Sequence, residues 1–204
     1  MLELLRDGKV FVVLSLLIEL QRLKRLDRTG WTLRGLPNGT ESVAAHSFGV
    51  SVTAMLLADE VKARGVELDV ERVLRMSLVH DWAETRIGDM PKTGTKYFGS
   101  DVRKAAETAA FADMVQGKTD LSSLYHDYEK RDSLEARLVK AADVLDLLIQ
   151  AYGLERAGAT GLDEFWEVAS DADFQLPPVA NEVVHELLEL IVTERRGLRI
   201  ATDD

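Results

Sequence analysis

The residues of this chain that are best suited to chemistry lie in the stretch 78–84. There, an adjacent histidine and aspartate, His80 and Asp81, are followed by Glu84 four positions after the histidine. Neutral imidazole and carboxylate are ligands of divalent transition metals, so this pair can supply two ligands from one segment of backbone. Glu84 would lie one helical turn beyond His80, close enough to act on a metal-bound water without binding the metal. The remaining ligands would have to come from other helices.

A second histidine, His46, lies in an apolar part of the sequence. Val43, Gly49 and Val50 would be its neighbours one turn away on a helix. A single histidine in such surroundings is more often a core residue that bonds a backbone carbonyl than a metal ligand. Two histidines buried in an interior rich in leucine and valine are harder to explain in that way, because a shared metal would offset the cost of burying both His46 and His80.

A carboxylate, Asp143, stands in an apolar helical stripe between Val139 and Leu147. A carboxylate in this position should be buried, and buried carboxylates are paired, protonated or bound to a metal. The alternative to a ligand role for Asp143 is a salt bridge to an arginine or lysine on another helix. Asp146, three residues further on, is predicted to be less enclosed.

Together, these residues form a possible ligand set of two histidines and two aspartates on three predicted helices: His46, His80, Asp81 and Asp143. Such a set suits one divalent transition metal, which could be Mn²⁺, Fe²⁺, Co²⁺, Ni²⁺ or Zn²⁺, with water in any open position. The ion would lower the pKa of its water and polarise a phosphoryl oxygen.

Two further carboxylates, Glu84 and Asp89, flank this set. One could align or deprotonate a water, and the other could protonate a leaving alkoxide. The alternative for Glu84 is a solvated side chain that pairs with Arg86 or Lys92. The alternative for Asp89 is a helix cap or a turn residue.

The loop that contains Arg28 and Trp31 is a candidate substrate-binding segment. Arg28 could hold a phosphate while Trp31 stacks on a base. The alternative is a loop tryptophan that covers the core. His126 and His185 lie among charged residues and are predicted to be on the surface.

The elements that must position these residues are predicted to be helices. Only four prolines occur, and apolar residues recur at helical spacing, with almost no alternation typical of strands. We therefore expect an all-α protein with one domain over residues 1–204. The helices are predicted over 2–26, 41–64, 69–86, 101–116, 121–130, 133–152, 162–169 and 179–196, with loops over 27–40 and 88–94.

Composition narrows the classes of function. The net charge of −10 should repel nucleic acid polymers, and a small anionic substrate would need cations placed at its site. The chain has no cysteine, which excludes disulfides and thiolate metal sites and fits a cytoplasmic protein. The longest apolar run, residues 10–18, is too short to span a bilayer, so no membrane span is expected. Glu3 and Asp7 precede this run and no small-residue cleavage site follows it, so no signal peptide is expected either.

The spaced pattern of His46, His80-Asp81 and Asp143 resembles the HD-domain superfamily of metal-dependent phosphohydrolases. Five blocks of sequence resemble the branch that contains bacterial 5′-deoxynucleotidases and their eukaryotic HD-domain relatives: 23–31, 41–47, 78–84, 87–91 and 139–143. The resemblance implies a compact, usually dimeric α-helical bundle that removes phosphate from deoxynucleoside 5′-monophosphates.

The resemblance also implies roles for individual residues. The two histidines and two aspartates of the pattern would bind the metal. Glu84 and Asp89 would act on water or the leaving group, and Arg28 with Trp31 would hold the nucleotide. Two residues separate Arg28 from Trp31, as in the eukaryotic-like members, whereas the two are adjacent in the bacterial enzymes. The loop after Asp89 is also longer, so both departures concern the substrate side.

The sequence therefore favours a phosphohydrolase that acts on (deoxy)nucleoside 5′-monophosphates through a metal-activated water, with one divalent transition metal and a homodimeric assembly. One alternative is an HD-type phosphodiesterase or pyrophosphohydrolase that acts on another nucleotide. Another is a non-catalytic nucleotide-binding protein with a structural metal. Glu84 and Asp89 argue against the latter, because a structural site would not need them.

Overall fold

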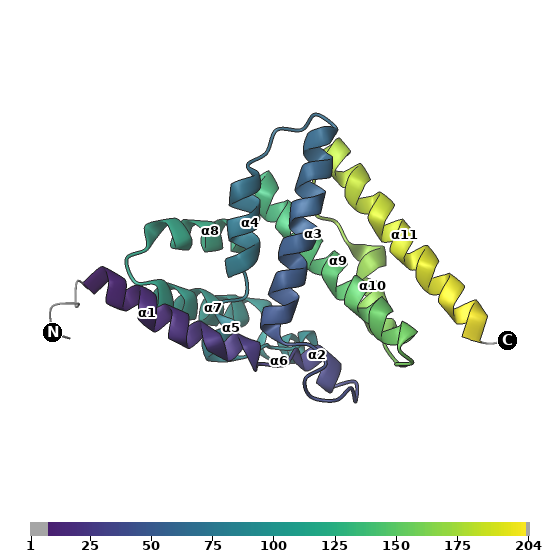
Figure 1. Cartoon of the computed structure of the whole chain (residues 1–204), viewed down its shortest axis with the longest axis horizontal. Coiled ribbons are helices and arrows are strands. Elements are labelled where there is room, and N and C mark those ends of the chain that lie inside the picture. Colours follow the sequence, from purple (N-terminus) through teal and green to yellow (C-terminus); the bar gives the residue numbers. More distant parts are fainter. Residues whose placement is uncertain (1–7, 203–204) are drawn as a thin grey trace. The chain divides into compact units, whose positions relative to one another are not determined.

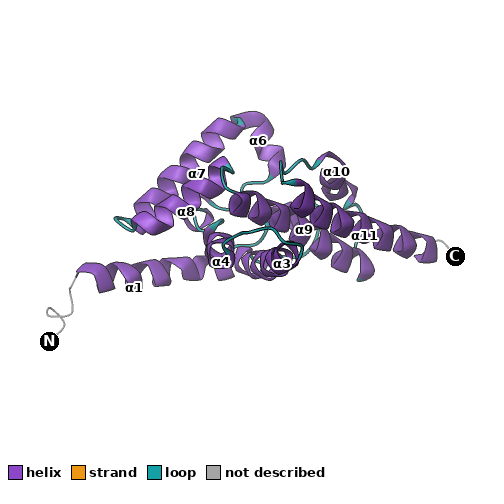
Figure 2. Cartoon of the chain, turned by 90° about the horizontal axis from the view of Figure 1, so that it is seen from above, coloured by secondary structure: helices purple, strands orange, loops and turns teal. Residues whose placement is uncertain are grey.

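The structure, a computed structural model, describes residues 8–202. Helices joined by loops make up this part of the chain, and it contains no strand (Figure 2). One isolated antiparallel bridge joins Asp27 to Ser42. The prediction of an all-α protein is confirmed. Among residues 8–202, no helix combines the length and the apolar character that crossing a bilayer requires.

Eleven α-helices and one 3-10 helix, η1, follow one another in this part of the chain. They are α1 (Gly8–Leu20), η1 (Gln21–Lys24), α2 (Thr29–Thr32), α3 (Val43–Ala63), α4 (Val70–Val79), α5 (Glu84–Ile87), α6 (Lys92–Phe98), α7 (Ser100–Val115), α8 (Thr119–Lys130), α9 (Leu134–Arg156), α10 (Asp163–Asp171) and α11 (Pro178–Thr202).

The contacts of the chain divide it into two compact units, each built from two separate segments. The first unit takes the described residues up to Ala45 together with 79–126, and the second takes 46–78 together with the described residues from 127 onwards. The boundaries fall inside α3, at the end of α4 and inside α8. A single domain over residues 1–204 stays a prediction.

The first unit is organised around α7 and the loop that precedes α3. Helices α5 and α6 both pack on α7, and α5 also packs on η1. Phe111 of α7 stacks on Tyr125, with ring centroids 3.9 Å apart, and is 6.3 Å from the ring of Trp82. These aromatic contacts fix the turn that contains Trp82 against α7.

The second unit is organised around α9, which packs on α10 and α11 (Figure 1). Ser133 caps α9 by accepting a hydrogen bond from the N–H of Ala136, and no glycine or proline interrupts the helix before Gly153. Its alanine, valine and leucine side chains are buried on several faces. A helix that is apolar on most sides belongs in a core, so α9 forms the centre of this unit.

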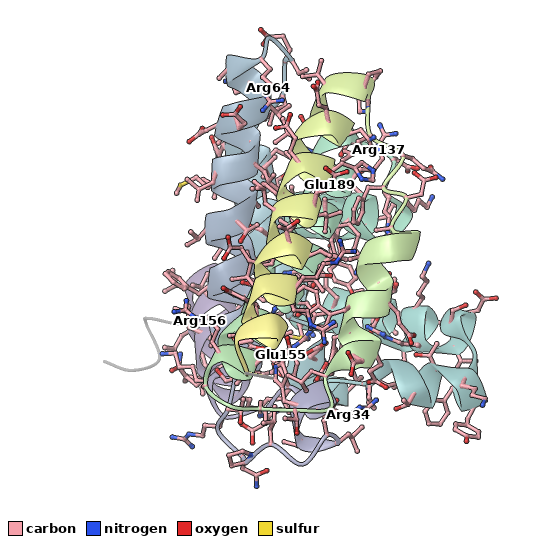
Figure 3. The ribbon with its side chains drawn as sticks, turned by 90° about the vertical axis from the view of Figure 1, so that its right-hand side faces the viewer. Arg34, Arg64, Arg137, Glu155, Arg156 and Glu189 are labelled. Atoms are coloured by element: carbon pink, nitrogen blue, oxygen red, sulfur yellow. The ribbon has the colours of Figure 1, made fainter. Side chains whose placement is uncertain are left out.

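Three ion pairs fix α11 in this unit, at two places on the helix. Arg64, just after α3, binds Glu186 of α11, with N–O distances of 3.2 and 2.8 Å. Arg195 of α11 binds Glu155 and Asp163 and lies over the ring of Trp166. Figure 3 shows Arg64 and Glu155 near opposite ends of α11. The long C-terminal helix is thus held at Glu186 and again at Arg195.

The prediction of one continuous helix over 69–86 is wrong at residues 80–83, where the structure has a turn between two helices. Helix α4 ends at Val79, residues 80–83 form a turn, and α5 begins at Glu84. Hydrogen bonds of the tighter i to i+3 kind close this turn, from the N–H of Trp82 to Val79 and from the N–H of Glu84 to Asp81. No glycine or proline lies at residues 79–84, so the sequence contains no signal that the helix ends there, and the helical spacing of apolar residues predicted one continuous helix.

Other helices differ at their ends. Of the helix predicted over 2–26, residues 2–7 lie outside the described part, and residues 21–24 form η1. The predicted loops 27–40 and 88–94 contain α2 and the start of α6, which follows Pro91. Proline suits the beginning of a helix because its φ is already helical. Helices α9, α10 and α11 extend beyond their predicted ends, and the remaining helices agree within two residues.

Candidate active site

His46 and Asp143 lie together in the second unit. His46, on α3, is only 1% exposed, and its Nε2 is 3.1 Å from Oδ1 of Asp143 on α9. The other ring nitrogen, Nδ1, is 2.8 Å from Oδ2 of Asp146. Both ring nitrogens of His46 therefore lie beside carboxylates.

The two carboxylate oxygens of Asp143 have different partners. Oδ2 accepts hydrogen bonds from Nζ of Lys140, at 2.6 Å, and from the hydroxyl of Tyr128, at 3.3 Å. Oδ1 faces His46. A lysine partner for Asp143 was the alternative to a ligand role, but Lys140 is on the same helix and occupies one oxygen only. Oδ1 thus remains directed at the imidazole.

His80 and Asp81 form a similar pair in the first unit. His80 is 3% exposed, and its Nε2 is 3.2 Å from Oδ2 of Asp81. In a regular α-helix, side chains of adjacent residues diverge by about 100°. The turn after Val79 removes this difficulty, because it leaves the helical path at the position of the pair. The two side chains can therefore meet at one point.

The two histidine–aspartate pairs fit a transition metal by their chemistry and their spacing. Two ligand atoms about 2.1 Å from an ion, at right angles to each other, lie about 3.0 Å apart. The N–O distances are 3.1 Å for the pair His46 and Asp143, and 3.2 Å for the pair His80 and Asp81. Imidazole nitrogen with carboxylate oxygen is a donor set that divalent transition metals accept.

Glu84 is buried at the first position of α5. Burial raises the pKa of its carboxyl well above the ordinary value, and the nearby carboxylates of Asp81 and Asp89 raise it further, against the opposing effect of Arg28 and Arg103. Its Oε2 has no hydrogen-bond partner within the described residues. These properties favour a protonated carboxyl. The alternative of a solvated Glu84 is wrong, since the side chain is 4% exposed.

Arg86, the proposed partner of a solvated Glu84, is engaged elsewhere. Its guanidinium binds Glu19 and Asp113. These two contacts tie α1 and α7 to α5. Arg86 therefore belongs to the packing of the first unit.

Asp89 binds the segment that contains Arg28. Its Oδ2 accepts hydrogen bonds from the backbone N–H of Thr29, at 2.6 Å, and from the Thr29 hydroxyl, at 3.0 Å. Its Oδ1 is 3.3 Å from Nη1 of Arg28, and the same nitrogen is 3.7 Å from Oδ2 of Asp81. Asp89 therefore holds Arg28 beside an expected metal ligand.

The backbone around Arg28 is fixed by pairing with the segment before α3. The N–H of Arg28 bonds the carbonyl of Glu41, and the N–H of Val43 bonds the carbonyl of Leu26. These two bonds close the loop between them. Arg28 thus starts from a fixed backbone position, which limits the places that its guanidinium can reach.

Trp31 is a core residue of the first unit. Its side chain is 1% exposed, and its indole N–H donates a 2.6 Å hydrogen bond to Oε2 of Glu41. This burial favours the interpretation that Trp31 covers the core. His126 and His185 are exposed, which confirms that they are surface residues.

Sequence reasoning missed Asp146 as a part of the site. It was expected to be less enclosed than Asp143, but the two side chains are 13% and 15% exposed, so this expectation is wrong. Asp146 follows Asp143 by three residues, and Gly49 follows His46 by three. This matched spacing on two helices was the only sequence signal that could have indicated the contact.

The chain is similar in sequence and in fold to known proteins. A family model described as "HD domain" matches residues 20–172. A relative from Danio rerio, named 5′-deoxynucleotidase HDDC2, is 32% identical over 165 residues, which is 78% of each chain. A conserved hypothetical protein from Pyrococcus furiosus has a solved structure with a TM-score of 0.78 and 38% identity, covering 88% of this chain and 99% of its own. A second solved structure, of a protein from Pyrococcus horikoshii OT3, has a TM-score of 0.76 and 35% sequence identity, and the match covers 87% of this chain and 97% of that protein.

Proposed function

The chain belongs to the HD domain family, and we propose that it is a metal-dependent phosphohydrolase that removes phosphate from (deoxy)nucleoside 5′-monophosphates. The observation that carries the proposal is the presence of two histidine–aspartate pairs at ligand spacing within a matched HD domain. The relative from Danio rerio is named a 5′-deoxynucleotidase, which supports this class of substrate.

We propose that the two pairs together hold one divalent transition metal, with His46, His80, Asp81 and Asp143 as the ligands. The donor set of two imidazoles and two carboxylates supports Mn²⁺, Fe²⁺, Co²⁺, Ni²⁺ or Zn²⁺ as the ion. When bound, the ion supplies activation of the attacking water and polarisation of the phosphoryl group.

Arg28 is the proposed phosphate-binding side chain of the enzyme. Its guanidinium can donate two parallel hydrogen bonds to phosphoryl oxygens, which a lysine cannot do. Asp89 and the backbone bond to Glu41 fix Arg28 in place before a substrate arrives. Such fixed charge stabilises the negative charge that develops during phosphoryl transfer without reorganisation of the site.

Glu84 is the proposed proton-transfer residue. A buried carboxyl with a raised pKa can carry a proton, which the leaving 5′-oxygen needs. Asp89, also expected to act on water or the leaving group, already accepts hydrogen bonds at both oxygens from Arg28 and Thr29. These contacts favour a positioning role for Asp89 and leave Glu84 as the stronger candidate for proton transfer.

Trp31 is proposed to support nucleotide binding indirectly, by holding the loop that carries Arg28. Its ring lies in the core and its indole N–H binds Glu41, the residue whose carbonyl pairs with Arg28. Loss of the ring would therefore loosen the backbone that presents the arginine. This role does not require the ring to stack on a base.

Phosphate release from a panel of 5′-deoxyribo- and ribonucleoside monophosphates tests the proposed function. The protein is stripped with a chelator and then supplied separately with Mn²⁺, Co²⁺ or Zn²⁺. We expect release that depends on the metal and is lost in Asp81→Ala, while Asp59→Ala, at an exposed position of α3, behaves as wild type.

Three other results would contradict this function in different ways. Products other than inorganic phosphate and a nucleoside would indicate a phosphodiesterase or a pyrophosphohydrolase. Nucleotide binding without turnover under every metal would indicate a binding protein with a structural ion. Phosphate release that persists in Asp81→Ala would show that the pair of His80 and Asp81 is not needed for the reaction.

We also propose a cytoplasmic homodimer. The dimer is supported by α1, which exposes the apolar side chains of Val10, Phe11, Leu14, Leu17 and Ile18. Exposed apolar surface of this extent is typical of a protein–protein interface. Light scattering after size-exclusion chromatography should give twice the chain mass for the wild type, and Leu14→Glu should reduce it to that of one chain. A wild-type mass of one chain would contradict the dimer.

A further inference from the structure

We infer that Asp146 is a positioning residue for His46, and that residue 49 is a glycine because the carboxylate of Asp146 occupies the space beside it. All three residues belong to the second unit. The inference rests on the proposed function, since it takes His46 to be a metal ligand. It adds two residues to that function, one on α9 and one on α3.

The contact between Asp146 and His46 is short and enclosed. Oδ2 of Asp146 is 2.8 Å from Nδ1 of His46, and the two side chains are 13% and 1% exposed. A carboxylate at Nδ1 favours the form of the imidazole in which Nδ1 carries the proton. Nε2, the nitrogen 3.1 Å from Asp143, then keeps its lone pair for a metal.

Gly49 is the second half of this arrangement. A Cβ at this position would lie 2.1 Å from Oδ1 and 2.8 Å from Cγ of Asp146, distances at which one group must move. Glycine inside a helix is less favourable than alanine. Its presence in the interior of α3 therefore has a local reason, since only a residue without a side chain lets the carboxylate approach His46.

The arrangement is specific to this place on the two helices. Gly153 lies on α9, as Asp146 does, and a Cβ there would meet no atom within 4 Å. The close approach is thus a property of the contact with Gly49 and not of glycines in these helices generally. Gly153 supplies a matched control, because its replacement tests the effect of alanine in a helix without touching Asp146.

The experiment measures Co²⁺ binding by the stripped full-length chain, with Co²⁺ as the probe and its visible absorption as the spectroscopic signal. Loss of a carboxylate that supports a histidine ligand costs about 10- to 100-fold in metal affinity. We expect a loss of this size in Asp146→Ala and Gly49→Ala, with an altered cobalt spectrum. Gly153→Ala should bind as wild type. Asp146→Asn should recover part of the affinity, because its amide oxygen can still accept a hydrogen bond from the Nδ1–H of His46.

A double-mutant cycle separates the proposed contact from general damage to α3. In the Asp146→Ala background the space beside residue 49 is vacant, so adding Gly49→Ala should cost no further affinity. Thermal unfolding without metal shows whether each variant keeps its fold. If Asp146→Ala does not fold, the same comparison is made with Asp146→Ser as the background, because serine also lacks the carboxylate oxygens that a Cβ at residue 49 would meet.

Two results would overturn the inference alone. One is wild-type cobalt affinity and spectrum in Asp146→Ala and Asp146→Asn. The other is a loss from Gly49→Ala that is equally large whether or not Asp146 is present. If instead the wild-type chain binds neither Co²⁺ nor Mn²⁺, the proposed metal site itself fails, and the inference fails with it. The wild-type measurement thus distinguishes the two failures.

Discussion

Nε2 of His46 lies 3.1 Å from Oδ1 of Asp143, although the two residues stand on helices far apart in the sequence. The remaining polar atoms of both side chains have partners of their own: Asp146 at Nδ1 of the histidine, and Lys140 and Tyr128 at Oδ2 of the aspartate. These partners fix both side chains in the orientation in which Nε2 and Oδ1 face each other. The pair is therefore preorganised by α3 and α9.

Asp143→Ala should remove metal binding and turnover together. A lost ligand should cost more than the ~10- to 100-fold that a lost supporting residue costs in metal affinity. Equilibrium dialysis against Mn²⁺, with phosphate release measured in parallel, checks this result. Asp59→Ala is the control at an exposed position. Retention of one Mn²⁺ per chain at wild-type affinity would contradict the ligand role of Asp143.

Glu84→Gln should lower kcat by about 10²- to 10⁴-fold, the range that a lost proton-transfer group costs. Metal affinity should be unchanged, since Glu84 is not among the proposed ligands. The substitution keeps the volume of the buried side chain, so the fold should persist. Steady-state kinetics with a saturating nucleotide, beside a metal titration, separates the two effects. Full turnover with bound metal would remove Glu84 from catalysis.

Arg28→Lys should be nearly as harmful as Arg28→Ala, because a lysine lacks the planar fork that can bind two phosphoryl oxygens. A lost hydrogen bond to a charged group costs about 1.5–3 kcal/mol, which corresponds to roughly 10- to 160-fold in kcat/KM. Asp89→Asn should produce a smaller loss through the displaced guanidinium. A lysine variant with wild-type kcat/KM would show that a positive charge alone is sufficient.

Asp127 should make the stability of the second unit depend on pH. Burial by itself would raise the pKa of this carboxyl, but hydrogen bonds from Ser133 and the pairing with Arg72 outweigh burial, so that the pKa is lowered overall. A lowered folded-state pKa contributes stability above the unfolded value, and this stability is lost as the pH falls through the folded pKa.

Asp127→Asn should therefore lose about 1–3 kcal/mol of unfolding free energy near neutral pH. The difference from wild type should shrink below about pH 4, where the unfolded carboxyl is protonated. Urea unfolding at several pH values checks this result. A constant difference across the range would mean that the charge of Asp127 is not involved.

The residues proposed as metal ligands could be singled out in the sequence because their chemical types and order are distinctive. His46, Asp143 and the adjacent pair were identified from residue type, apolar surroundings and a resemblance to a known pattern. The all-α fold class could also be predicted, because apolar residues recur at helical spacing along most of the chain. The exposed histidines, His126 and His185, were recognised by their charged neighbours.

The remaining features depend on contacts that no local pattern encodes. Helix α4 ends at Val79 without a glycine or proline, in a turn that Trp82 anchors through the ring of Phe111. Asp146 was expected to be less enclosed because only its neighbours on α9 were considered, whereas Gly49 on another helix admits it. Both misjudgements arise where a partner distant in sequence outweighs local preference.

The interleaving of the two units has a consequence for biosynthesis. The chain leaves the ribosome from its N-terminus, so both histidines of the proposed centre emerge well before α9. Asp143 and Asp146 reach His46 only after α9 has been made and has packed against α3. An incomplete nascent chain therefore cannot assemble this pair, and the metal site proposed here would be complete only after most of the protein has been translated.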